Sequence, residues 1–154
     1  VGVAIGSALA ALLTPAATRR FGFARWPVAL LTLAAIVEVA FGLPYRLALF
    51  PIAAFGLGLC AQGFKICVDT RVQRTIEDAY RGRVFTVYDT VFNISFVAAA
   101  VVTALALPDS GHSPVSVLAV GAGYLVIAAV YLRVAGADPD LVDLSPAPAA
   151  NTTP

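Results

Sequence analysis

The sequence is poor in charge: only 12% of its 154 residues are Asp, Glu, Lys or Arg, whereas 60% are hydrophobic. An ordinary soluble domain carries about 25% charged residues. A chain this short needs polar surface to cover its core when water surrounds it. The shortage therefore argues against an ordinary soluble domain and predicts an all-α integral membrane protein. A net charge of +1, without a basic stripe, gives no reason to expect a nucleic-acid partner.

Residue types that commonly bind metals or cofactors are also scarce. The two cysteines, Cys60 and Cys67, do not form a CxxC motif. On one helix they would lie roughly 10 Å apart, which is too far for a disulfide, so we expect two small buried side chains. The single histidine, His112, falls in a predicted outer loop. We expect no metal, no cofactor and no enzymatic activity, because a membrane enzyme would need carboxylate pairs or a His-rich face.

What the sequence does contain is a series of apolar runs, each long enough or nearly long enough to cross a bilayer. Prolines, glycines and polar residues separate them. Gly2, Gly6 and Ala10 follow a small-xxx-small spacing that would let another helix approach closely. The predicted spans form a helical bundle over residues 1–136 and cover about 1–18, 27–43, 48–70, 84–107 and 115–132.

The two ends of the chain differ in character. There is no methionine, and the sequence opens inside an apolar run without the basic start of a signal peptide. We therefore expect the chain to be the end of a longer protein. Residues 137–154 are rich in Pro, Ala and small polar residues, and this composition predicts a disordered tail.

The arginines indicate an orientation. With five spans, the connections alternate sides, and only Arg46 falls on the side where the chain starts. The positive-inside rule makes the other, arginine-rich side cytoplasmic, so the tail is predicted to be cytoplasmic too. The arginines on that side are Arg19, Arg20, Arg25, Arg71, Arg74, Arg81, Arg83 and Arg133.

Four charged residues fall inside predicted spans, where each costs about 2.5–3.5 kcal/mol at mid-bilayer unless it finds a partner or water. Glu38 lies near the outer end of its span. It is a candidate pathway residue that meets substrate or a proton. An equally open interpretation is that it reaches the lipid headgroups or pairs with Arg46.

The other three, Lys65, Asp69 and Asp89, are predicted to form one cluster near the cytoplasmic side. Lys65 and Asp69 are four residues apart and share a helix face. The next span runs in the opposite direction, which brings Asp89 to a similar depth. The cluster is either a latch that fixes how the two helices dock or a gating, proton or substrate site. Three polar side chains lie nearby in the sequence as further pathway candidates: Gln62, Tyr88 and Asn93.

Between these two spans lies a polar connector, TIEDAYRGR, which we predict to be a short cytoplasmic loop. Asp78 precedes the following helix, whose positive end favours an anion. Gly82 would let the chain turn sharply between Arg81 and Arg83, which can anchor on phosphates or acidic groups.

The segment VQRTIEDAYRGRVFTVYDTVFN resembles the connection between the tenth and eleventh helices of major facilitator superfamily transporters. It is most similar to the drug- and siderophore-exporter-like branch, whose pattern has the form Q-x3-PD-x2-RGRV-[FM]-S. Glu77 replaces the usual proline and Thr86 the serine. A second segment, PAATRRFGFAR, is similar to a degenerate copy of the family's loop motif. The residues that match the first pattern are Gln73, Asp78, Arg81, Gly82, Arg83, Val84 and Phe85.

The resemblance implies the carboxy-terminal part of a twelve-helix secondary transporter, roughly helices eight to twelve. It implies proton-driven export of a small molecule across a bacterial inner membrane, with substrate bound between two halves of the transporter. The partners would be the bilayer, the missing amino-terminal half and an unknown substrate. The fragment alone would be inactive. The alternative is a non-transporting, multi-pass scaffold or interaction protein.

Overall fold

The computed structural model describes residues 1–76, 78–108 and 112–137, and every regular element in these ranges is helical. Four of the described helices are long and apolar enough to cross a membrane. The predicted all-α class is therefore confirmed. In order, the elements are α1 (Gly2–Val37), the π-helical turn η1 (Glu38–Gly42), the 3-10 turn η2 (Leu47–Leu49), α2 (Phe50–Thr75), α3 (Asp78–Ala106) and α4 (Pro114–Ala137).

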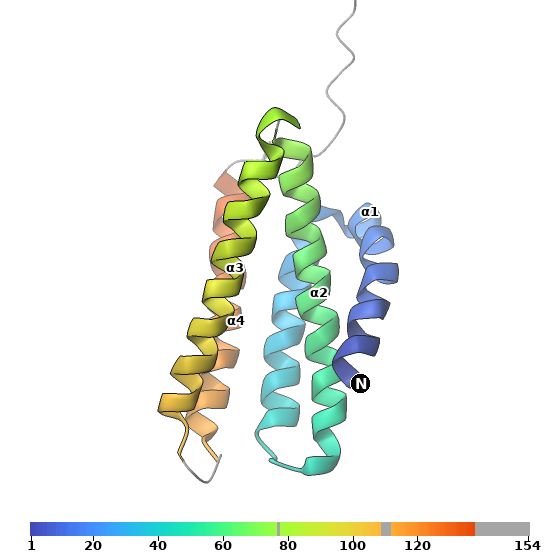
Figure 1. The fold of residues 1–154 in the computed structure, drawn as a ribbon. Coiled ribbons are helices and arrows are strands. Elements are labelled where there is room, and N and C mark those ends of the chain that lie inside the picture. Colours follow the sequence, from blue (N-terminus) through green and yellow to red (C-terminus); the bar gives the residue numbers. More distant parts are fainter. Residues whose placement is uncertain (77, 109–111, 138–154) are drawn as a thin grey trace, which may run out of the picture.

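The long helix α1 is interrupted at Gly22, whose φ of 83° and ψ of 161° are not helical. Only glycine adopts this combination readily, because a Cβ atom would clash with the backbone. Figure 1 shows the chain reversing direction there, so that α1 consists of two limbs, residues 2–21 and 23–37. The predicted spans 1–18 and 27–43 fall on the first limb and on the second limb with η1.

The first limb of α1 packs against α2 almost backbone to backbone. A Cβ atom added at Gly6 would fall on the carbonyl oxygen of Phe55, and one added at Gly58 would lie 2.6 Å from the carbonyl oxygen of Val3. The Ser7 hydroxyl donates to the Gly58 carbonyl at 3.3 Å. Ala10 is 1% exposed. The small-residue spacing that begins at Gly2 therefore marks a close helix contact, as predicted.

The connection before α4 is tied to the turn before α2. The Ser113 hydroxyl accepts a hydrogen bond from the backbone N–H of Ser116 at 3.2 Å, and α4 begins at Pro114, so this helix is capped as its sequence suggests. The Tyr45 hydroxyl accepts a hydrogen bond from the N–H of Ser113 at 2.9 Å. The Tyr45 ring also lies 4.5 Å from the His112 ring, centroid to centroid. These contacts hold one end of the bundle together.

The connector between α2 and α3 is much shorter than predicted. Helix α2 continues through Thr75 and α3 already begins at Asp78, so the predicted loop 75–83 is wrong. Gly82 does not turn the chain: it is helical, and its carbonyl accepts a hydrogen bond from the Thr86 hydroxyl at 2.9 Å. The segment contains no proline, and its Ala and Arg residues favour a helix. The polar side chains of this segment predicted a loop, but polar residues are equally compatible with an exposed helix.

The core lies between the two limbs of α1, α2 and α4. The buried apolar residues of the described chain belong to α1, α2 and α4, and no described side chain of α3 is buried. Both cysteines are free and buried, as predicted. Apart from Ala137, which ends α4, the predicted tail 137–154 lies outside the described residues.

Candidate functional site

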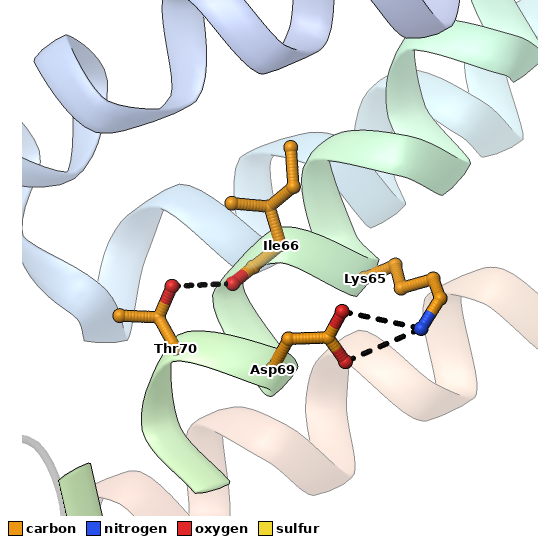
Figure 2. A network of polar contacts seen from close by, with 4 residues as sticks. All are labelled: Lys65, Ile66, Asp69 and Thr70. Atoms are coloured by element: carbon orange, nitrogen blue, oxygen red, sulfur yellow. Dashed lines mark hydrogen bonds and ion pairs between the residues drawn. The ribbon is translucent and has the colours of Figure 1, made fainter. Parts of the chain in front are cut away.

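Helix α2 carries an ion pair between Lys65 and Asp69. The Lys65 ammonium lies 3.1 Å from Oδ2 and 3.3 Å from Oδ1 of Asp69, one helical turn away. Figure 2 shows both carboxylate oxygens turned toward the ammonium. The two side chains are 32% and 27% exposed, so the pair lies at the edge of the bundle rather than in its core.

Helix α3 faces this pair with two aromatic rings and a carboxylate. The Lys65 ammonium lies 5.2 Å from the ring centroid of Tyr88 and 5.4 Å from that of Phe92, within the range of cation–π attraction. Asp89 is close enough to interact electrostatically with Lys65, but it is exposed and makes no ion pair within the described chain. The structure thus brings Lys65, Asp69 and Tyr88 together, whereas Asp89 stays outside the ion pair.

The other two polar candidates contribute less. Asn93 is exposed, and its amide donates to the carbonyl oxygen of Asp89 at 2.7 Å, within its own helix. Gln62 is half-buried on α2, one turn before Lys65, and no hydrogen bond joins it to the ion pair. Neither residue lines the cavity described next.

Beside the ion pair lies a cavity of about 450 Å³ that all four long helices line. Lys65 is the only charged side chain among the described residues that line it. Four aromatic side chains also contribute, and the remaining lining residues are aliphatic or small. The aromatic residues are Phe64, Tyr88, Phe92 and Tyr124.

Glu38 lies at a second cavity, of about 400 Å³, nearer the opposite end of the bundle. This cavity also receives hydroxyl groups from Tyr45, Thr103, Ser113 and Ser116. Glu38 starts the π-helical turn η1, a distortion that often marks functional sites. No ion pair joins Glu38 to Arg46, although both residues are described.

A polar network at the arginine-rich end was not predicted. The Arg71 guanidinium donates to the Tyr131 hydroxyl at 3.2 Å, and this hydroxyl donates to the carbonyl oxygen of Phe23 at 2.9 Å. The Arg74 guanidinium lies 5.4 Å from the centroid of the Phe23 ring. The network ties α2, α4 and the start of the second limb of α1 together. The only sequence signal was an arginine and a tyrosine near the ends of two spans on the same predicted side.

The residues that resemble the family connector lie around the junction of α2 and α3. Gln73 is exposed near the end of α2, and Gly82 and Arg83 are exposed in the first turns of α3. The Arg81 guanidinium donates to the carbonyl oxygen of Ile76 at 3.4 Å, which braces the junction. Asp78 is the first residue of α3. None of these residues lines the central cavity.

Comparisons with known proteins found relatives that are named as transporters. The chain is similar to uncharacterized MFS-type transporters of Mycobacterium tuberculosis and Mycobacterium bovis, each 39% identical over 122 residues. These residues make up 79% of this chain and 27% of each relative, so the chain spans about a quarter of the length of the curated relatives it matches. No protein-family model and no solved structure matches it. The similarity is therefore to part of proteins that are named as MFS-type transporters, and four of the described helices are long and apolar enough to cross a membrane.

Proposed function

We propose that this chain is part of a secondary active transporter that exports a small molecule by alternating access, driven by a proton gradient. The observation that carries the proposal is the similarity, over most of the chain, to relatives named as MFS-type transporters. This chain corresponds to only a part of such a transporter. The substrate path would therefore be completed by the remaining segments of the transporter, and the chain alone would be inactive.

The proposed arrangement has five crossings, equivalent to helices eight to twelve of the family. Two observations support it. The chain reverses at Gly22, between the two limbs of α1. The first limb, and the second limb together with η1, each have about 20 residues, which is enough for about 30 Å of helix. The break at Gly22 and the junction of α2 with α3 also lie at the same end of the bundle (Figure 1).

The arginine-rich end of the bundle would face the cytoplasm of a bacterial cell, with the tail on the same side. This end carries the Arg71 network, whereas Arg46 lies in the turn between η1 and η2 at the other end. In this orientation the Lys65 cluster lies nearer the inner side of the membrane and Glu38 nearer the outer side.

Within the transporter, the cluster of Lys65, Asp69 and Asp89 would gate the path or exchange protons and substrate. Asp89 supports this role over a purely structural latch, because it lies within electrostatic range of Lys65 but outside the ion pair. An exposed carboxylate on a membrane helix is expensive unless water or a moving partner reaches it. Glu38, which has no ion-pair partner in the described chain, is the matching candidate on the outer side.

One observation is equally compatible with the alternative of a non-transporting scaffold or interaction protein. No described side chain of α3 is buried, and large apolar residues such as Phe96 and Leu105 are exposed along it. A partner helix could cover this face in a scaffold as well as in a transporter.

The experiment that separates the two functions uses the complete gene product that contains this chain. Energised, everted membrane vesicles from a strain with the gene deleted and from the same strain with the gene restored are tested for accumulation of a panel of labelled organic compounds. A transporter gives accumulation only with the gene, and a protonophore abolishes it. The double variant Lys65→Gln, Asp89→Asn should lose this activity at an unchanged protein level, whereas Arg133→Gln, an exposed cation outside the cluster, should retain it. Export of every transported compound at the normal rate by the double variant would remove the cluster from the transport mechanism.

A further inference from the structure

The central cavity has a marked chemical character that the proposed function leaves unassigned. Aromatic and aliphatic side chains make up almost all of its wall, and about 450 Å³ is open between the four long helices. Among the described residues, the one charged group that borders it is the ammonium of Lys65. A wall of this kind suits a ligand with a rigid apolar body, since ligand pockets are mostly apolar with a few placed polar groups.

Lys65 retains bonding capacity on the cavity side. A lysine ammonium has three N–H donors, and Asp69 accepts the hydrogen bonds that Lys65 makes within the described chain. The Tyr88 and Phe92 rings lie near the ammonium without accepting a conventional hydrogen bond from it. At least one N–H is therefore available to an acceptor that enters the cavity.

The charges are arranged asymmetrically around this ammonium. Lys65 borders the cavity, whereas neither Asp69 nor Asp89 does. An anionic group in the cavity would meet the ammonium first and the carboxylates only behind it. A cationic group would meet the ammonium first and be repelled by it.

We propose that this cavity binds a lipophilic organic anion: an aromatic or aliphatic body held by the ring-lined wall, with one carboxylate on the Lys65 ammonium. The position of the ammonium selects this occupant, because it offers an N–H donor at an apolar wall that neither carboxylate lines, and a charge-assisted hydrogen bond is stronger there than in water. The inference deepens the proposed function by naming a class of molecule and rests on that function for its biological meaning. Equilibrium binding itself requires no transport.

The test uses three probes that share one aromatic body: 2-naphthoate, the neutral 2-naphthalenemethanol and the cationic (2-naphthylmethyl)trimethylammonium. Equilibrium binding of each probe is measured on the complete gene product that contains this chain, purified into zwitterionic lipid nanodiscs, with empty nanodiscs as the blank for partition into lipid. We expect saturable binding of 2-naphthoate and at least about tenfold weaker binding of the other two probes. Equal binding of all three, or preferred binding of the cation, overturns the proposal.

Two variants on α2 should change 2-naphthoate binding in opposite directions. Lys65→Gln removes the cation and should weaken binding at least about tenfold. Asp69→Asn removes the competing carboxylate and should strengthen binding several-fold. Arg133→Gln, an exposed cation outside the cavity, should leave it unchanged. A purely structural ion pair would instead weaken the binding of all three probes in both variants alike, and that result would contradict the proposal.

The position of the site is tested by filling the cavity. Ala61 borders the cavity from α2 and is otherwise exposed, so Ala61→Phe places a ring in the cavity without displacing a buried side chain. With helicity retained by circular dichroism, this variant should lose 2-naphthoate binding. Full binding by folded Ala61→Phe protein would locate the anion elsewhere and refute the assignment of this cavity. Loss of binding with normal transport by the complete gene product would separate this inference from the proposed function.

Discussion

Because the first limb of α1 approaches α2 closely at Gly6, we expect that adding one methyl group there lowers the stability of the protein. In Gly6→Ala the new Cβ would fall on the carbonyl oxygen of Phe55 and lie 2.9 Å from the backbone nitrogen of Leu59. Both neighbours are backbone atoms, so neither can rotate away as a side chain would. The two helices must separate, and contacts such as the hydrogen bond from Ser7 to the Gly58 carbonyl weaken with them.

The magnitude follows from two opposing effects. Overpacking a tight contact costs about 1–3 kcal/mol, and an overlap with backbone belongs at the upper end of this range. Replacing a helical glycine by alanine returns about 1 kcal/mol of helix propensity. We therefore expect Gly6→Ala to lower the free energy of unfolding by about 2 kcal/mol.

Gly82 provides the matched control. It is also helical, and a Cβ atom added there would meet nothing within 4 Å. Gly82→Ala should therefore raise the free energy of unfolding by up to about 1 kcal/mol. Both variants are unfolded reversibly by SDS in mixed micelles and followed by the fluorescence of Trp26, the single tryptophan. Equal stability of the two variants would refute the backbone contact between α1 and α2.

Three further predictions use the same unfolding measurement. Tyr131→Phe removes the hydroxyl that joins Arg71 to the carbonyl oxygen of Phe23 and should cost about 1–3 kcal/mol; an unchanged value would mean that the network does not form in the membrane. Ser113→Ala removes the N-cap of α4 and should cost about 1 kcal/mol, with faster amide exchange in the first turn of that helix; unchanged exchange would contradict the cap. Gly22→Ala introduces a side chain at a φ of 83° and should cost about 1–3 kcal/mol, and a neutral effect would be incompatible with the break in α1.

The fold class could be predicted from the sequence, because a segment that crosses the bilayer must be composed mainly of apolar residues. Long apolar runs must be helical to satisfy their backbone groups in lipid, so each of α2, α3 and α4 could be predicted as a helix, although the end of α2 and the start of α3 could not. The start of α4 at Pro114, with Ser113 as its cap, is a local feature, since capping depends on neighbouring residues alone. The small-residue spacing at Gly6 likewise predicted a close contact, although not its partner on α2.

Connections and long-range contacts were harder to predict. The segment around Gly82 is helical, although a loop was expected there. The prediction failed because polar residues indicate contact with water and do not determine the backbone conformation. Lys65 and Asp69 share a helix face, so their proximity followed from spacing. The bond between Arg71 and Tyr131 joins residues 60 positions apart and depends on how α2 and α4 pack, which no local pattern encodes.

The cavity beside Lys65 could not be predicted at all. Its wall combines residues of four helices, and apart from Lys65 and Tyr88 each of them looked like an ordinary apolar position in its own run. Cavities arise from the mismatch of packed surfaces, and that mismatch is a property of the assembled bundle. The sequence therefore identified Lys65 as a candidate site residue but did not indicate the cavity beside it.

Both the proposed transport role and the cavity depend on how the chain crosses the membrane, and the sidedness of five exposed positions measures this directly. In a variant without native cysteines, single cysteines are introduced by Arg20→Cys, Leu47→Cys, Tyr80→Cys, Val115→Cys and Arg133→Cys and labelled with an impermeant maleimide in intact cells and in everted vesicles. Five crossings predict that positions 20, 80 and 133 react only from the cytoplasmic side and positions 47 and 115 only from outside. A cysteine at position 20 that is protected from both sides, or that reacts from the side opposite to position 80, would contradict the reversal at Gly22 and the architecture built on it.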